Sequence, residues 1–322
     1  MMEYTIRASD SGQRMDRFCQ RILKDAPKSF LYKMFRKKNI TLNGNKAQGN
    51  ERLQENDVIR FYLSDETFEK FQGKANAVQK PASGIPTPDI VYEDFNVLVV
   101  NKPAGILSQK AKDNDLSMNE ICLTYLQRTG AYDPNDVSAF KPSVCNRLDR
   151  NTSGLLLVAK TLCGARMLSK ILRERNIGKY YVCVVKGRIE EPFDLKGYLK
   201  KDASTNTVRI SKEQTAGADP VETSFSVIET TDRLTLLKVH LLTGKTHQIR
   251  AHLSSIHHPI LGDPKYGDFA LNQEYKCNTQ MLCAWRIEMP KLEQPFEELS
   301  ERIIEIPIPQ SFTDVLQRAK ER

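Results

Sequence analysis

Residues 145–154 read Cys-Asn-Arg-Leu-Asp-Arg-Asn-Thr-Ser-Gly, and the rest of the chain is organised around this stretch. It is polar, places one carboxylate, Asp149, between two arginines, and runs directly into five apolar residues at 155–159. A short apolar run bounded by glycine and lysine predicts a strand buried on both faces, which puts the preceding loop at the edge of a sheet. One interpretation is a turn whose Asn, Thr and Ser side chains cap their own backbone. The other places Asp149 at the mouth of a functional cleft.

The composition is that of a soluble globular protein with more than one domain. The 322 residues are 40% hydrophobic and 27% charged, and no apolar run approaches the about 18 residues that a membrane span requires. The first residues do not begin a secretory signal. Seven scattered cysteines without a C-x-x-C pair predict reduced core thiols rather than a disulfide or zinc framework. We therefore expect a cytoplasmic monomer with no membrane association.

Positive charge is concentrated near the N-terminus. The net charge is +8, and residues 14–38 hold nine basic side chains against two acidic ones, a local excess of seven. Such a cluster is typical of a nucleic-acid-binding module, although amphipathic helices with a solvated basic face remain the alternative.

Two short basic helices are predicted within this cluster. Apolar residues at 15, 18, 19, 22 and 23 follow the spacing of one buried helix face, and those at 30, 31, 34 and 35 repeat it after Pro27. An Asn-Gly turn at 43–44 and a strand at 57–63 predict hairpin-like structure after the helices.

This segment resembles the S4 RNA-binding domain over about its first 63 residues. The matching pieces are Arg-Met-Asp at 14–16, Ser29, Leu-Asn-Gly at 42–44 and Asn-Asp-Val-Ile at 56–59. Asn56 stands where the domain usually has glycine, and asparagine tolerates the left-handed conformation needed there. The resemblance implies a small α/β domain at 1–64 that binds RNA through basic side chains, namely Arg14, Arg17, Lys33, Arg36 and Lys37.

The remainder divides into a linker, a large domain and a tail. Residues 65–88 are rich in Gly, Pro and Ser with little periodicity, so we interpret them as a linker. Residues 89–310 predict a mixed, largely antiparallel β-sheet with flanking helices, an α+β fold, and 311–322 are interpreted as a C-terminal tail. The strands are expected at 90–100 as a hairpin, 155–159, 179–187, 221–228, 234–242 and 281–289, and the helices after Ser117 and Thr161.

Four stretches of the large domain, in order, resemble the RNA pseudouridine synthases of the Rlu group. They are Asn-Lys-Pro-Ala-Gly at 101–105, residues 147–154, Lys-Tyr-Tyr at 179–181 with Gly187, and residues 242–250 continued by 258–267. An S4 module before such a domain is a known arrangement of the family. The resemblance implies a cofactor-independent enzyme that isomerises uridine in ribosomal RNA, with transfer RNA as the other possible substrate.

The resemblance also implies roles for individual residues. Asp149 is the catalytic aspartate, Arg250 its guanidinium partner, and Tyr181 the active-site tyrosine that stacks on the uracil. Tyr180 points to the opposite face of the strand, so only one of the two tyrosines can serve. The remaining expectations are that Arg147 fills the gap left by a flipped base, that Ile249 packs under the base and that Lys245 contacts a phosphate.

Two residues depart from the family pattern. Asn146 stands where the family usually has a histidine before Arg-Leu-Asp, and Cys283 replaces a common histidine near the last strand. Neither departure removes a group that the reaction requires, but both bear on which RNA is recognised.

Two other functions and a metal site are alternatives to this interpretation. A non-catalytic RNA-binding or ribosome-assembly factor would keep the basic module without needing Asp149. A glycosidic hydrolase would need a second carboxylate, for which Asp263 is the candidate. All five histidines lie between 240 and 258, but His247 and His252 lack the spacing of a metal-binding helix, so no metal site is expected.

Overall fold

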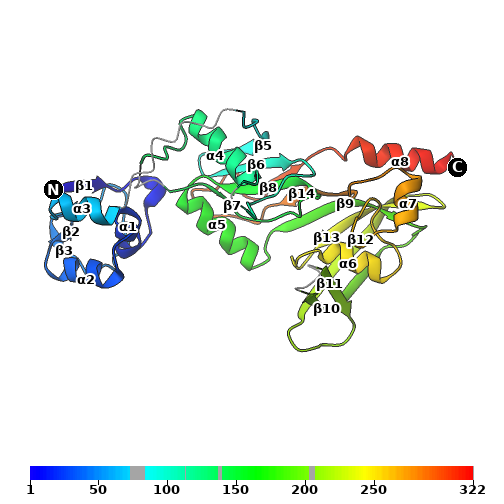
Figure 1. Cartoon of the computed structure of the whole chain (residues 1–322), viewed down its shortest axis with the longest axis horizontal. Coiled ribbons are helices and arrows are strands. Elements are labelled where there is room, and N and C mark those ends of the chain that lie inside the picture. The colour runs from blue at the N-terminus through cyan, green and yellow to red at the C-terminus, as the bar shows by residue number, and fades with distance from the viewer. Residues whose placement is uncertain (73–83, 113, 137–139, 203–206, 322) are drawn as a thin grey trace.

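The computed structural model describes residues 1–72, 84–112, 114–136, 140–202 and 207–321. They form a small N-terminal unit around a four-stranded sheet and a large unit around an eleven-stranded sheet. The two units lie at opposite ends of the long axis of the molecule in Figure 1. They meet where Arg7 pairs with Asp136 at 2.8 Å and where Arg166 Nη1 donates to the Ser11 carbonyl at 3.2 Å.

The N-terminal unit confirms the two predicted basic helices and the hairpin after them. Helices α1 (Met15–Ile22) and α2 (Lys28–Arg36) bury the predicted apolar faces and leave most of their basic side chains exposed. The turn at Asn43 and Gly44 has positive φ angles of 51° and 77°, and Asn56 has the left-handed φ of 69° expected there. The sheet runs in the order β1 (Met2–Thr5), β4 (Val58–Phe61), β2 (Ile40–Leu42) and β3 (Asn45–Lys46), with the short helix η1 (Ala8–Asp10) after β1.

The segment interpreted as a linker differs from that interpretation at its start. Residues 65–72 form helix α3 (Asp65–Gln72), which packs on the core of the N-terminal unit. Phe68 is buried there, and the ring of Phe71 lies 4.4 Å from that of Phe30. With only two turns and two aromatic residues, the helix has too few positions to show a period in the sequence. Residues 73–83 of the expected linker lie outside the described part of the chain.

The large unit confirms a mixed, largely antiparallel sheet. All its strand pairs in the described residues are antiparallel except β14 with β8. The strands lie in the order β11 (Thr207–Ser211), β10 (Phe193–Asp202), β12 (Asp219–Thr230), β13 (Leu234–Leu241), β9 (Gly178–Lys186), β14 (Leu282–Glu288), β8 (Ser153–Ala159), β6 (Val97–Lys102) and β5 (Asp89–Glu93), while β15 (Ile303–Glu305) pairs with β14 and β7 (Ser143–Val144) with β8. The strands β10 and β11 are not among those expected from the sequence.

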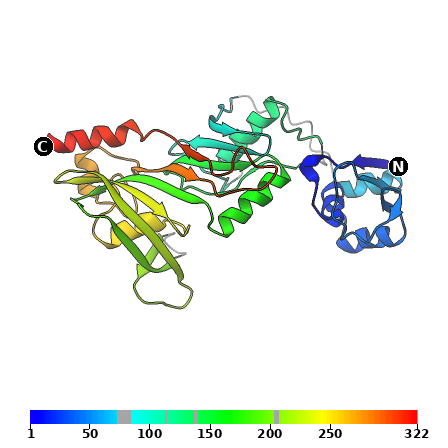
Figure 2. The ribbon, with the colours of Figure 1, turned by 180° about the vertical axis from the view of Figure 1, so that it is seen from behind.

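Helices cover both faces of this sheet, as Figures 1 and 2 show from opposite sides. Ser117 and Glu120 form the predicted capping box of α4 (Met118–Arg128), and the Thr161 side chain accepts from Gly164 N to begin α5 (Leu162–Arg173). The others are α6 (Gln248–Ser255), α7 (Phe269–Glu274) and α8 (Gln310–Lys320). Within the described ranges no helix combines the length and apolar character needed to cross a membrane.

The C-terminal residues also differ from the sequence interpretation. Residues 310–320 are the helix α8 rather than a tail outside the domain, and Phe312, Val315 and Leu316 are buried in a core of the large unit, where α8 packs against β13. The same sheet divides that core from a second one, because alternate residues of β9 face opposite sides. Val182 points to the core with α8, whereas Tyr181 points to the core that contains α4 and α6.

Candidate active site

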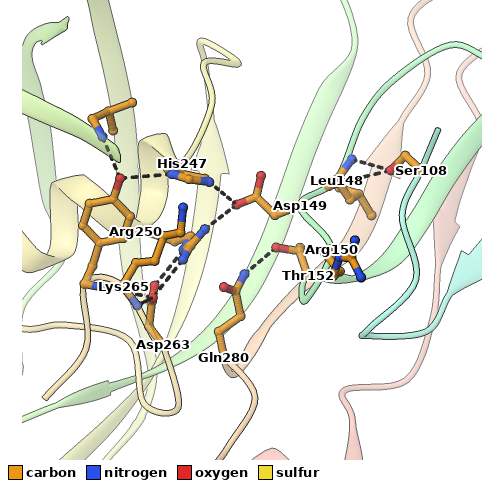
Figure 3. A network of polar contacts seen from close by, with 12 residues as sticks. Ser108, Leu148, Asp149, Arg150, Thr152, His247, Arg250, Asp263, Lys265 and Gln280 are labelled. Carbon is orange, nitrogen blue, oxygen red and sulfur yellow. Dashed lines mark hydrogen bonds and ion pairs between the residues drawn. The ribbon is translucent and has the colours of Figure 1, made fainter. Parts of the chain in front are cut away.

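The loop from 145 to 152 connects β7 to β8 and carries the partly exposed Asp149 (Figure 3). The Asp149 side chain is 26% exposed, whereas its neighbour Leu148 is buried. Ser108 fixes the Leu148 backbone with two hydrogen bonds, because its hydroxyl accepts from Leu148 N and donates to Leu148 O, each at 3.0 Å. The loop then enters β8 at Gly154, where φ is +107° and an added Cβ would lie 2.2 Å from the carbonyl oxygen of Ala284. This position accepts only glycine.

Lys102 anchors the same loop through a buried ammonium group. It ends β6, is 0% exposed, and its ammonium donates to the carbonyls of Pro103, Ile106 and Arg150 at 2.9, 2.7 and 3.0 Å. Burial lowers the pKa of Lys102 to about 8, although the charge of Asp149 favours the protonated form. Because Arg150 follows Asp149 directly, these hydrogen bonds fix the backbone that carries the carboxylate.

The turn after Asp149 is held by a distant side chain and by its own backbone. Gln280 Nε2 donates to the Thr152 hydroxyl at 2.6 Å, from a segment 128 residues further along the chain. The turn itself is closed by Thr152 N, which donates to the Asp149 carbonyl at 3.1 Å. The described part of the chain therefore shows a turn closed by its backbone and by Gln280, and not the side-chain capping by Asn, Thr and Ser of the first interpretation.

The two residues that depart from the family pattern have structural contacts. The Asn146 side-chain oxygen accepts from Leu157 N at 2.8 Å and so closes the loop against β8. A histidine ring nitrogen is also an acceptor, which gives a physical reason why asparagine can replace it. Cys283 is buried on β14 beside Ser153, and burial raises the pKa of its thiol to about 11.

Arg250 joins two carboxylates that are far apart in sequence (Figure 3). Its Nη1 donates to Asp149 Oδ2 at 2.8 Å, and its Nε and Nη2 donate to the two oxygens of Asp263 at 2.7 and 2.8 Å. The side chains of Arg250 and Asp263 are 4% and 0% exposed. Burial would raise the pKa of Asp263, but the hydrogen bonds and charge of Arg250 lower it below the usual range. A bidentate ion pair thus holds the guanidinium that contacts Asp149.

This geometry bears on the hydrolase alternative. Asp263 cannot serve as a second catalytic carboxylate in this arrangement, because it is inaccessible and both its oxygens are bound by Arg250. Asp149 keeps its second oxygen, Oδ1, without a hydrogen-bond partner among the described residues.

Tyr181 faces the Asp149 loop across one strand. On β14, Ala284 is paired with Tyr181 of β9 on one side and with Gly154 of β8 on the other. Tyr181 is 9% exposed, and its pKa is raised by burial and by the charges of Asp149 and Cys283. Tyr180 lies on the opposite face, stacked on His240 with ring centres 4.5 Å apart. The alternation of β9 therefore turns Tyr181, and not Tyr180, to the face that holds Leu148 of the Asp149 loop.

The other candidate residues are distributed around this centre. Ile249 is buried in the core with Tyr181, whereas Arg147 is exposed beside the loop. Lys245 pairs with Asp219 at 2.9 Å, so a phosphate would have to compete with that carboxylate.

In the N-terminal unit, the predicted RNA-binding residues differ in how far they are engaged. Arg14 is occupied by Asp16, to which it donates at 3.1 and 2.8 Å. The remaining four basic side chains are exposed, namely Arg17, Lys33, Arg36 and Lys37.

Sequence reasoning missed three residues of this centre. In the sequence, Lys102 appears only as part of a motif. His247 appears only as a possible metal ligand, yet its Nε2 lies 3.7 Å from Asp149 Oδ2. Tyr266, which contacts His247, was not singled out. The signal available was their place inside the quoted motifs. Across the described residues, no group of three or more His, Cys, Asp or Glu side chains is placed to hold a metal ion.

Comparisons with known proteins agree with the motifs. The family model for RNA pseudouridylate synthase matches residues 96–255. The ribosomal large subunit pseudouridine synthase C of Haemophilus ducreyi is 33% identical over 279 residues, which are 85% of this chain and 82% of the relative. An uncharacterized RNA pseudouridine synthase of Mycoplasma genitalium is 30% identical and covers 90% of each chain. The solved structure of human RNA Pseudouridylate Synthase Domain Containing 4 has a TM-score of 0.58 at 21% identity, over 72% of this chain and 93% of that chain, and supports the fold.

Proposed function

The chain belongs to the RNA pseudouridine synthases, and we propose that Asp149 is its catalytic aspartate and that large-subunit ribosomal RNA is its substrate. One observation carries the assignment of Asp149. Its carboxylate is partly exposed, has Oδ2 fixed by Arg250 and leaves Oδ1 without a partner in the described structure.

The chemistry needs a carboxylate of this kind. Conversion of uridine to pseudouridine breaks the bond from the ribose to uracil nitrogen, turns the base and rejoins it through carbon 5. A carboxylate with one free oxygen can attack or deprotonate the ribose, or add to the ring, while Arg250 holds the other oxygen. No electrons are gained or lost, so the isomerisation needs no redox partner.

Neighbouring side chains support the base and the RNA. Tyr181 stacks on the flipped uracil with Ile249 beneath it, and the exposed Arg147 occupies the place that the base leaves in the stack. Lys245 contacts a phosphate in exchange for Asp219. Flipping costs a few kcal/mol, which these contacts offset.

The N-terminal unit is proposed to be an S4-like RNA-binding domain. Of the exposed basic side chains proposed to bind RNA, Arg17 lies on α1, Lys33 and Arg36 lie on α2, and Lys37 follows α2 directly. The packing of α3 extends the domain from the predicted 1–64 to 1–72. The relatives named ribosomal large subunit pseudouridine synthase C support ribosomal RNA as the substrate over transfer RNA.

Comparison of pseudouridine maps tests the proposal. Chemically probed ribosomal and transfer RNA from cells that lack the gene should lose specific pseudouridines, which the wild-type gene restores and Asp149→Asn does not. Asp314→Asn is the matched control, because this exposed carboxylate lies on α8 and, within the described structure, accepts a hydrogen bond from Gln310 alone.

The outcomes separate the alternatives. Loss of sites in transfer RNA alone would move the substrate to that class. An Asp149→Asn strain with an unchanged map would refute the catalytic role, and rescue of the growth phenotype by Asp149→Ala but not by Arg36→Glu/Lys37→Glu would favour an RNA-binding factor.

A further inference from the structure

His247 lies between the proposed catalytic aspartate and a tyrosine that no step of the proposed function uses. It precedes α6 with a left-handed backbone, φ 54° and ψ 15°, and its side chain is only 9% exposed. On one side its Nε2 lies 3.7 Å from Asp149 Oδ2. On the other its Nδ1 lies 3.0 Å from the Tyr266 hydroxyl (Figure 3).

The hydrogen bonds of Tyr266 decide which histidine nitrogen carries the proton. The Tyr266 hydroxyl oxygen accepts from Val208 N at 2.7 Å, and that donor is fixed because a backbone amide can only donate. With one lone pair of the oxygen used by Val208 N, the arrangement favours a hydroxyl proton that points to His247 Nδ1, so that Nδ1 is the acceptor. In a neutral imidazole an accepting Nδ1 leaves the proton on Nε2, the nitrogen that faces Asp149.

Tyr266 is itself held in place. Its ring lies under the Arg250 guanidinium, with 5.1 Å from the guanidinium carbon to the ring centre, and it packs on the small core formed with Val208 and Ala251. Val208 belongs to β11, so the hydrogen-bond series begins on the outermost strand of the sheet and ends at the active site.

We propose that His247 and Tyr266 are positioning residues for the reaction, in which Tyr266 fixes the tautomer of His247 so that its Nε2–H donates to Asp149 Oδ2. This inference rests on the proposed function of Asp149. At 3.7 Å the contact is longer than a hydrogen bond, and it closes when RNA fills the site, because catalytic hydrogen bonds tighten in the substrate complex. With Arg250 and His247 both on Oδ2, Oδ1 is the oxygen presented to the nucleotide.

Burial is the main reason why the pKa of His247 is lowered, and the surrounding charges partly cancel one another. Burial lowers its pKa, and the cations Arg250 of α6 and Lys265 of the following loop lower it further, against the carboxylates Asp149 and Asp263, which raise it. Hydrogen bonding from Tyr266 to Nδ1 also favours the neutral ring. Removal of that hydroxyl should therefore raise the pKa of His247, so that the ring becomes charged at a higher pH.

Single-turnover rates with a ribosomal RNA fragment test the role. His247→Leu should slow the reaction by about 10- to 100-fold with RNA affinity unchanged, as expected when a group that orients a reacting residue is lost. His247→Gln keeps an N–H donor at a similar reach and should recover most of the rate. Tyr266→Phe should slow the reaction less and move the acidic limb of the pH–rate profile to higher pH. Tyr180→Phe is the matched control, because it removes a hydroxyl that contacts Glu288 on the other face of β9.

Nitrogen NMR of histidine-labelled full-length protein gives a readout that does not depend on activity. The His247 signals, assigned by their loss in His247→Gln, should show a protonated Nε2 and an unprotonated Nδ1, and Tyr266→Phe should mix the two tautomers. A protonated Nδ1 in the wild type would overturn the inference. So would wild-type rates and pH profiles in both His247→Leu and Tyr266→Phe, or equal losses in His247→Gln and His247→Leu. If any of these results were found while Asp149→Asn was inactive, the inference about His247 and Tyr266 would be wrong but the proposed function of Asp149 would still hold.

Discussion

Replacement of Asp263 by asparagine tests how the proposed active site is supported. Asp263 is fully buried and accepts two hydrogen bonds from Arg250 and two from the backbone nitrogens of Lys265 and Tyr266. Removal of one partner of a buried ion pair costs about 3–5 kcal/mol, because the other charge remains buried without compensation. Arg250 still has Asp149 as a partner at 2.8 Å, so we expect Asp263→Asn to cost about 3 kcal/mol, the lower end of that range.

Urea unfolding followed by fluorescence measures this cost in the correct part of the molecule. The chain has one tryptophan, Trp285, and it lies on β14 next to Ala284, which pairs with Gly154 at the end of the active-site loop. A loss of about 3 kcal/mol also corresponds to a fall of roughly 6–12 °C in the melting temperature of a domain of this size.

A double-mutant cycle isolates the pair from other effects of the substitution. In an Arg250→Met background the Asp263→Asn change no longer strands a guanidinium, so it should cost at least about 2 kcal/mol less than in the wild type. Additive costs in the two backgrounds would refute the claim that the ion pair holds Arg250. A cost below about 1 kcal/mol in the wild type would refute the argument from burial.

Four further outcomes follow from the same contacts. Gly154→Ala should destabilise the protein by about 2 kcal/mol or more and abolish activity, because the alanine Cβ would collide with the backbone of Ala284. An unchanged midpoint in thermal melts would contradict this. Asn146→His should keep near wild-type stability, whereas Asn146→Leu should lose about 1–3 kcal/mol in urea unfolding because a buried amide loses its acceptor. Arg36→Glu/Lys37→Glu should weaken RNA binding and make the slope of log affinity against log salt shallower by about two, and an unchanged slope would argue against phosphate contacts there. The lowered pKa of Asp263 contributes stability that is fully present above its unfolded pKa of about 3.9 and is lost as pH falls through the lower folded pKa; acid unfolding of the Arg250→Met variant should lack that component.

The sequence predicted the parts of the molecule that depend on local pattern. The faces of α1 and α2, the capping box at Ser117 and the alternation that separates Tyr180 from Tyr181 all follow from spacing over a few residues. The order of the motifs also allowed Arg250 to be placed with Asp149 through the family resemblance.

The contacts that hold this centre together could not be obtained in the same way. Asp149 and Arg250 are 101 residues apart, and Gln280 reaches Thr152 across 128 residues. The local pattern does not show that Asp263 is buried. It also does not show that His247 lies next to Asp149 instead of in a metal site. Such contacts depend on which strands become neighbours in the sheet, and local spacing does not determine that order.

The parallel pairing of β14 with β8 has a consequence for how the enzyme becomes active during its synthesis. β14 separates β9, which carries Tyr181, from β8, which begins at the Asp149 loop, so until Leu282–Glu288 is inserted both neighbouring strands have an open edge. The backbone that surrounds Gly154 is also supplied by β14. We therefore expect a nascent chain that has emerged only as far as Gln280 to contain every proposed catalytic side chain and yet to be inactive, with activity gained only after β14 has left the ribosome.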